Sequence, residues 1–378
     1  MKNYKNDFAS FDDKIWLNAA SEGPLPLVSA KALQDAVEWK SKPYQLDIPR
    51  FISTQKELKE SIGRLLNVPF RDVILGNSAS YGLHLLANGI PWKPGDEIIL
   101  MQNDFPADIL PWLALEQRGV VIRQVKARKQ VLQPDELLEN INERTKLFCI
   151  SHVHTFTGVM LDVGQFAAIC AEKGILFVLN LSQSVGTLPI DLSQLSVDAV
   201  VSAGYKWLCG PYGTGFCWIK PELRNQLIVN QAYWSAVLSE EDLKGEDALS
   251  PKDLKTARVF DVFGTANFFN FVPFKAAIDY FLDVGLKNVR SYHDRLIDRL
   301  IQEINTDQYE FISPKEGNQR SSLVFISHRE KWKNEHIINQ LIEQGIYPGF
   351  WKGNIRLAPH IYNTEEEILS VAKTLNNL

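Results

Sequence analysis

Short apolar runs alternate with segments of helical periodicity over the first two thirds of the chain. The runs predicted to be strands are Asp72–Leu75, Glu97–Met101, Val120–Val125, Lys146–Ser151, Leu176–Leu179, Ala199–Ser202 and Gly215–Ile219. The predicted helices are Ser29–Lys40, Ser53–Leu66, Tyr81–Asn88, Ile109–Arg118, Pro134–Asn140 and Val163–Lys173, with Ser53 as the expected N-cap of the second. Apolar strands between helices are typical of a mostly parallel sheet that is covered on both faces. We therefore predict an α/β fold in which a seven-stranded sheet is sandwiched by helices.

The pattern changes after Asn270. The predicted helices are Val272–Val284, Leu286–Asn305, Lys333–Gln344 and Glu365–Leu378, and the predicted strands are Ser322–Ser327 and Ile355–Leu357. This mixture indicates a smaller α+β domain. Because 378 residues exceed what one core usually supports, we expect an N-terminal segment (1–20), a large α/β domain (21–271) and a small C-terminal domain (272–378).

The composition is that of a globular protein and argues against several classes. A net charge of −5 gives no basic footprint for nucleic acid or for an acidic membrane surface. No apolar run approaches the ~18 residues of a membrane span, and the first ten residues lack the apolar core of a signal peptide. The spacing of the four cysteines fits neither a zinc site nor a disulfide framework. We expect a soluble cytoplasmic protein with no nucleic-acid or membrane partner.

Polar and aromatic residues follow several predicted strands directly, at the edge of the sheet where ligands of α/β proteins gather. Gly76–Ser80 follows the first strand and opens a helix, an arrangement that suits a phosphate, although an N-cap role for one of its serines is the commoner explanation. Phe105 follows the next strand and can present its ring to a flat ligand or lie in the core. His152 and His154 lie two residues apart without a third metal ligand at suitable spacing, so we expect no metal.

One lysine, Lys206, follows the strand Ala199–Ser202 and lies between Tyr205 and Trp207. Burial beside two aromatic rings removes water from the amine, which lowers its pKa and makes it a better nucleophile toward carbonyls. A lysine that forms a Schiff base needs these properties. The alternative is a loop lysine whose stem covers the rings.

Three segments of the chain, Leu17–Ala20, Gly204–Gly213 and Arg356–Ile368, resemble the class V aminotransferase group of pyridoxal 5′-phosphate (PLP) enzymes. The group includes cysteine desulfurases, selenocysteine lyases, kynureninases and isopenicillin-N-epimerase-like proteins. The resemblance covers nearly the whole chain, and Asn77–Leu86 looks most like kynureninases. It implies the PLP-dependent transferase fold type I, PLP as the cofactor, an amino-acid substrate and a homodimer.

The resemblance also implies which residues hold the reactive and the anionic ends of PLP. Lys206 would form the internal aldimine, which is the Schiff base with the cofactor. The phosphate would be held by the backbone amide of Ala79, by Ser80 and by Tyr205. Thr265 would add a phosphate contact from the second subunit, so the active site implies a dimer.

Further roles concern the cofactor ring and the substrate. By resemblance, Phe105 would stack on the pyridine ring, Gln183 would bond the ring's 3′ oxygen, and Thr155 stands where desulfurases place asparagine beside that oxygen. Arg356 would clamp the substrate α-carboxylate. Relatives carry an acidic residue, in a D-x-x-Q pattern, where this chain has Asn180. A neutral amide cannot stabilise a pyridinium by charge, but it can donate a hydrogen bond to an unprotonated nitrogen.

These observations lead us to expect a PLP enzyme that acts at the α-carbon of an amino acid, as an aminotransferase, epimerase or lyase. The alternative is a degenerate relative with a binding or regulatory role, because Asn180 weakens the electron sink. A protein for a different nucleotide-like ligand has little support, because no G-x-G-x-x-G or P-loop motif is present. Cysteine desulfurase activity is disfavoured, because Tyr347–Ile355 contains no cysteine. The expected pocket walls include Tyr233, Trp234, Phe350 and Trp351.

Overall fold

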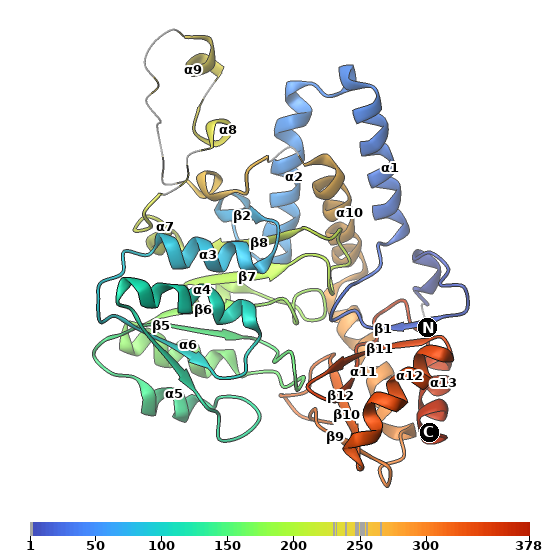
Figure 1. The fold of residues 1–378 in the computed structure, drawn as a ribbon. Helices are drawn as coiled ribbons and strands as arrows, with labels where there is room; N and C mark the ends of the chain where they lie inside the picture. Colours follow the sequence, from blue (N-terminus) through green and yellow to red (C-terminus); the bar gives the residue numbers. More distant parts are fainter. Residues whose placement is uncertain are drawn as a thin grey trace.

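Two β-sheets form the framework of the molecule (Figure 1). The computed structural model describes residues 3–378 except 230, 232, 239, 246–248, 250–253, 255, 265 and 266. The large sheet has the order β2-β8-β7-β6-β5-β3-β4 and the small sheet the order β1-β11-β12-β10-β9. The strands of the large sheet are β2 (Val73–Gly76), β3 (Glu97–Met101), β4 (Val121–Val125), β5 (Thr145–Ser151), β6 (Leu176–Asn180), β7 (Ala199–Ala203) and β8 (Gly215–Ile219).

The large sheet is parallel from β7 to β4, whereas β8 runs antiparallel to both of its neighbours. Alternate side chains of β3 enter different hydrophobic clusters, with Ile98 and Leu100 on one face and Ile99 and Met101 on the other. Helix α3 (Ala79–Gly89) covers the first face, and α2 (Ile48–Leu66) and α6 (Val163–Lys173) cover the second. The predicted seven-stranded, mostly parallel sheet between helices is therefore confirmed.

The other helices are α1 (Leu27–Ser41), α4 (Leu110–Leu113), α5 (Pro134–Asn140), α7 (Pro221–Arg224), α8 (Trp234–Val237), α9 (Glu240–Lys244), α10 (Phe268–Val284), α11 (Leu286–Glu303), α12 (Asn334–Glu343) and α13 (Glu365–Asn376). Helix α10 packs against α1 and α2, on the side of the molecule that Figure 1 shows at the upper right. No helix within the described residues is long and apolar enough to cross a membrane.

Two predictions about helices were wrong in detail. Helix α2 begins at Ile48, because the side chain of Asp47 caps the backbone N–H of Arg50 at 3.0 Å. Ser53 lies inside this helix and is not its N-cap. The predicted helix Ile109–Arg118 is the short helix α4 followed by a 3-10 helix, and Pro111 lies in the first turn of α4, where a proline is tolerated.

The small sheet includes a strand from the beginning of the chain. Strand β1 (Ile15–Leu17) pairs in parallel with β11 (Ile346–Trp351), which also pairs with β12 (Asn354–Leu357). Strands β10 (Val324–His328) and β9 (Tyr309–Phe311) complete the sheet. The sequence analysis missed β1, β9 and β11, because two of them have only three residues and β11 contains a proline and a glycine. The first residues of the chain therefore lie beside the last ones.

Candidate active site

Loops from the carboxyl ends of the large sheet surround a narrow pocket of about 40 Å³. Eight of the nine residues that were predicted to hold the cofactor line it, and they are Ala79, Ser80, Phe105, Thr155, Asn180, Gln183, Tyr205 and Lys206. The ninth, Thr265, lies outside the described residues. Tertiary folding therefore brings together side chains that are up to 127 positions apart in the sequence.

Lys206 is buried at the loop that follows β7, with 9% of its surface exposed. Its Nζ lies 5.2 Å from the centroid of the Phe105 ring. Burial and the positive charge of Arg356 together lower the pKa of this amine to about 8, against the opposing negative charge of Asp108. About a tenth of the amine is thus uncharged and free to act as a nucleophile at pH 7, whereas at the ordinary pKa the uncharged share would be far below a hundredth.

The backbone around Lys206 is held by both ends of the chain. The carbonyl oxygen of Tyr205 accepts a hydrogen bond of 2.8 Å from the N–H of Gly23. A Cβ atom at Gly23 would lie 2.1 Å from the carbonyl oxygen of Lys206, so the close approach needs glycine. The carbonyl oxygen of Trp207 is 2.8 Å from Nε2 of His360. The position of Lys206 therefore depends on the small domain as well as on the large sheet.

The N-terminus of α3 lies at the pocket, which Ser78, Ala79 and Ser80 line. Ser78 is the N-cap, and its hydroxyl accepts a hydrogen bond of 3.3 Å from the N–H of Tyr81. The N-cap explanation is thus right for Ser78, while Ala79 and Ser80 line the pocket. Because the first amides of a helix have no partner within it, this end of α3 suits a phosphate.

A buried network lies behind Asn180. Its Nδ2 donates to both carboxylate oxygens of Asp108, at 2.8 and 3.0 Å, and its Oδ1 accepts from the N–H of Ser182 at 2.9 Å. The hydroxyl of Ser151 lies 2.8 Å from Asp104 Oδ1 and 3.0 Å from Asp108 Oδ2. Burial, together with the nearby charge of Asp104, raises the pKa of Asp108 to about 8.

Gln183 and Tyr205 make further contacts in the pocket. The Oε1 of Gln183 accepts from the indole N–H of Trp207 at 2.7 Å, and its Nε2 donates to the carbonyl of Ala20 at 3.0 Å. One amide hydrogen of Gln183 remains for a ligand oxygen. The ring of Tyr205 lies 4.6 Å from that of Tyr212, and burial raises the pKa of the Tyr205 hydroxyl.

Arg356 on β12 is an almost fully buried cation, with 1% of its surface exposed. Its Nη2 donates to Oδ1 of Asn18 at 2.8 Å and to the hydroxyl of Ser21, while Nε has no hydrogen-bond partner among the residues that the structure describes. In the described part of the chain no carboxylate pairs with it, and burial lowers its pKa to about 10. A Cβ atom at Gly349, on the facing strand, would come within 2.8 Å of Nε. This unpaired guanidinium suits an anionic group of a substrate.

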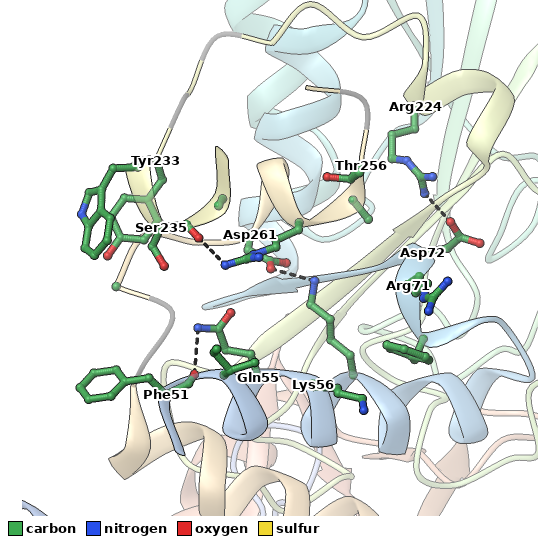
Figure 2. Close-up of a pocket in the computed structure, with 18 residues that line it drawn as sticks. Phe51, Gln55, Lys56, Arg71, Asp72, Arg224, Tyr233, Ser235, Thr256 and Asp261 are labelled. Carbon is green, nitrogen blue, oxygen red and sulfur yellow. Dashed lines mark hydrogen bonds and ion pairs between the residues drawn. The ribbon is translucent and has the colours of Figure 1, made fainter. Parts of the chain in front are cut away.

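The expected pocket walls are divided between two places. The guanidinium of Arg356 lies 5.4 Å from the ring of Trp351, and the Trp351 ring lies 5.8 Å from that of Phe156. Tyr233 and Trp234 instead line a separate cavity of about 720 Å³ beside α2 (Figure 2). Within one subunit the structure therefore does not bring these two residues to Lys206.

The sequence analysis missed the partners of the two key side chains. Asp104 and Asp108 flank Phe105 in one loop after a buried strand, and two acids at such a position were a signal for a buried network. Nothing in the sequence pointed to Asn18 and Ser21 as the residues that hold Arg356, because this contact joins opposite ends of the chain.

The residues around the pocket fit PLP. The α3 N-terminus suits the phosphate, Phe105 lies beside Lys206, and the buried amine of Lys206 makes no ion pair within the described residues.

Comparison with known proteins identifies the family. The family model for class-V aminotransferases matches residues 47–348. The chain belongs to this family. A probable cysteine desulfurase of Methanothermobacter thermautotrophicus is 24% identical, with 99% of this chain and 97% of that protein covered. A kynureninase of Shouchella clausii is also 24% identical, with 98% and 90% covered. A solved structure of a C-DES mutant with glycine linked to its PLP cofactor has a TM-score of 0.91 at 20% identity, with all of both chains covered.

The cofactor of class-V aminotransferases is PLP, so the family and cofactor predictions are confirmed. The comparisons do not support the prediction that desulfuration is disfavoured, because one of the relatives is named as a cysteine desulfurase. In the structure all four cysteines are buried, and burial raises the pKa of each thiol; they are Cys149, Cys170, Cys209 and Cys217.

Proposed function

We propose that this class-V aminotransferase acts at the α-carbon of an amino acid, with Lys206 as the residue that binds PLP covalently. The observation that carries the proposal is the pair of buried cations at one site. Lys206 and Arg356 are close enough for the charge of Arg356 to lower the Lys206 pKa, and neither has a carboxylate partner within the described residues. Two buried cations without counter-ions are energetically costly, and a ligand that neutralises or bonds to them explains why they are present.

Each cation has a distinct task in this proposal. The amine of Lys206 would hold the cofactor covalently, and the guanidinium of Arg356 would bind the α-carboxylate of the substrate through its fork of N–H groups. When bound, PLP supplies an electron sink for the electrons of a bond broken at the α-carbon. The uncharged Lys206 amine would accept or return the α-proton of the substrate, and its pKa of about 8 suits that exchange near neutral pH.

The other pocket residues hold and orient the cofactor. Ala79 N–H and Ser80, at the start of α3, together with Tyr205, bind the phosphate. The ring of Phe105 covers one face of the cofactor, and the remaining N–H of Gln183 binds its ring oxygen. Because these groups come from rigid element ends, they fix the ring plane relative to Lys206.

The chemistry of this chain's thiols argues against desulfuration by a cysteine of its own. A persulfide-forming cysteine must reach the substrate as a thiolate, and all four cysteines are buried with raised pKa values. Transamination, epimerisation and elimination need no such thiol. The free state of the cysteines is in keeping with the proposed cytoplasmic location.

We further propose a homodimer, in which Thr265 reaches the phosphate of the partner subunit. Support comes from the exposed apolar side chains around the cavity in Figure 2, which include Ile52 at 59% and Trp234 at 55% exposure. A monomer has no use for this surface. Sedimentation should give twice the mass of 42.9 kDa, and Thr265→Ala should weaken PLP binding without changing that mass. A monomeric protein with full PLP affinity would contradict the proposal.

The decisive experiment measures exchange of the α-proton in deuterated water. The protein is loaded with PLP and incubated with single amino acids, including cysteine and kynurenine, and exchange is followed by proton NMR. We expect a yellow protein that exchanges at least one amino acid, borohydride labelling at Lys206, and no exchange by Lys206→Ala. A colourless protein, or equal exchange by Lys206→Ala, would sink the proposal. A variant with all four cysteines replaced separates two reactions of cysteine. If it still releases sulfide, the reaction is elimination, because this variant has no thiol on which a persulfide can form.

A further inference from the structure

Relatives carry an acid where this chain has Asn180, but a carboxylate still lies next to this position. Asp108 lies directly behind Asn180, with both oxygens within 3.0 Å of its Nδ2. We propose that Asp108 is a positioning residue which, through the Asn180 amide, keeps the ring nitrogen of bound PLP protonated. This inference rests on the proposed function, because it requires PLP in this pocket.

The hydrogen bonds of Asn180 set the orientation of its amide. Oδ1 accepts from the N–H of Ser182, and Nδ2 donates to Asp108. If the amide were turned over, its NH₂ would face the N–H of Ser182 and its oxygen would face the carboxylate, so both contacts would be lost. The N–H of Ser182 therefore allows only one orientation of the Asn180 amide.

This orientation decides which atom is offered to a ligand. A carbonyl oxygen has two acceptor positions, and within the described residues only Ser182 uses one of those on Oδ1. Ser182 and Asn180 line the pocket, whereas Asp108 does not. The Nδ2 end is thus directed away from the pocket and the Oδ1 end toward it. Our expectation that Asn180 donates to an unprotonated nitrogen gives way to the opposite polarity, since an acceptor favours a nitrogen that carries a proton.

The carboxylate behind the amide strengthens this acceptor. A donor that bonds to a charged carboxylate is polarised, and the polarisation makes the oxygen of the same amide more negative. The chain of groups therefore runs from the Asp108 carboxylate through the amide to the ring nitrogen. The negative charge of Asp108 is thus separated from the ring by the Asn180 side chain, whereas an acid at position 180 would contact the ring directly.

The hydrogen bonds from Asn180 and Ser151 favour the charged form of Asp108, against burial and the charge of Asp104, which raise its pKa. Asp104 accepts from the N–H groups of Phe105 and Ser151, at 2.7 and 2.9 Å, so it does not need the Ser151 hydroxyl as a further donor. The single hydrogen of the Ser151 hydroxyl is then free to turn toward Asp108 Oδ2. Without PLP, the Lys206 cation also favours the charged form of Asp108.

Another titratable group that faces Asp108 is the thiol of Cys149 on β5. Its pKa is raised by burial and by the charges of Asp108 and Asp104, so it remains neutral. In the empty pocket Asp108 holds its proton around neutral pH, and a positive ring nitrogen opposite Asn180 favours the release of that proton.

The test reads the ring nitrogen directly. PLP labelled with nitrogen-15 in the ring is bound to the protein, and its chemical shift is measured between pH 6 and 8. We expect the shift of a protonated ring in the unmodified protein and the shift of a neutral ring in Asp108→Asn, with PLP affinity lowered roughly tenfold in that variant. The double variant Asp108→Asn with Asn180→Asp returns a carboxylate to the pair and should restore the protonated shift.

The matched control is Asp198→Asn, because Asp198 is a partly buried aspartate that accepts from the N–H of Phe177 and does not line the pocket. It should keep the protonated shift. A neutral ring in the unmodified protein overturns the inference, and so does a protonated ring in Asp108→Asn. If Asp108→Asn does not fold, a neutral ring in the unmodified protein still overturns the inference. Failure of the unmodified protein to bind PLP overturns the proposed function, whereas binding with a neutral ring overturns this inference alone.

Discussion

Replacing Lys206 by methionine should make the cofactor-free protein more stable at neutral pH. The methionine side chain has a similar length and no charge, so it removes a buried ammonium that makes no ion pair within the described residues. Folding moves the pKa of the amine from 10.5 to about 8, and each pKa unit corresponds to roughly 1.4 kcal/mol. The buried charge therefore costs up to about 3 kcal/mol. The gain in Lys206→Met should not exceed that value.

The sign of the effect follows from proton binding. Below pH 8 the amine is protonated in both states, so the full cost is present. Between pH 8 and 10.5 the folded protein has released the proton while the unfolded chain keeps it, and stability rises with pH. Above pH 10.5 both states are neutral, and the contribution of the charge vanishes. The advantage of Lys206→Met should thus be largest below pH 8 and fade as the pH approaches 10.5.

Urea unfolding of both proteins without PLP, at several pH values, measures this difference. The exposed Lys173→Met serves as the control and should show no comparable pH dependence. Equal stability of Lys206→Met and the unmodified protein at pH 7 would refute the reasoning. A gain that persists unchanged to pH 10.5 would also refute it, since the cause would then be packing and not charge.

Three further variants test other parts of the structure. Arg356→Gln should raise KM for the amino acid roughly 10- to 100-fold, which corresponds to the free energy of a charge-assisted hydrogen bond. It should also raise the pKa of Lys206, because a neighbouring cation is removed. An unchanged KM in steady-state kinetics would contradict this prediction. Gly23→Ala should destabilise the protein by about 1–3 kcal/mol in urea and reduce PLP uptake, because its Cβ meets the Lys206 carbonyl at 2.1 Å, and wild-type uptake would be the contrary result. Asp47→Ala should cost about 1 kcal/mol through loss of the α2 cap without affecting PLP uptake, whereas Asp47→Asn should retain most of the stability.

The strands of the large sheet could be predicted from the sequence to within one or two residues. Strand β3 agrees at both ends with Glu97–Met101, because a continuous apolar run between polar loops has only one way to be buried. The three missed strands all belong to the small sheet. Ile15–Leu17 is too short to show a period, and it is a strand only because β11 offers it hydrogen bonds from the other end of the chain.

The site divides in the same way. Lys206, Ser80 and Arg356 could be selected from local motifs, since their neighbours in the sequence carried the signal. Their partners could not be selected, because Asp108 reaches Asn180 across 72 positions and Asn18 reaches Arg356 across 338.

The order of apolar runs fixed the α/β architecture, because burying those runs leaves few arrangements of strands and helices. Motif residues likewise identified the family before any contact was known. Only the tertiary structure decided the charge of the site. It put the Asp108 carboxylate behind the neutral amide of Asn180, and among the described residues it left the Arg356 guanidinium without a counter-ion. The physical reason is that electrostatic environment depends on distances in space and on exclusion of water, and neither quantity is written in the spacing of residues along a chain.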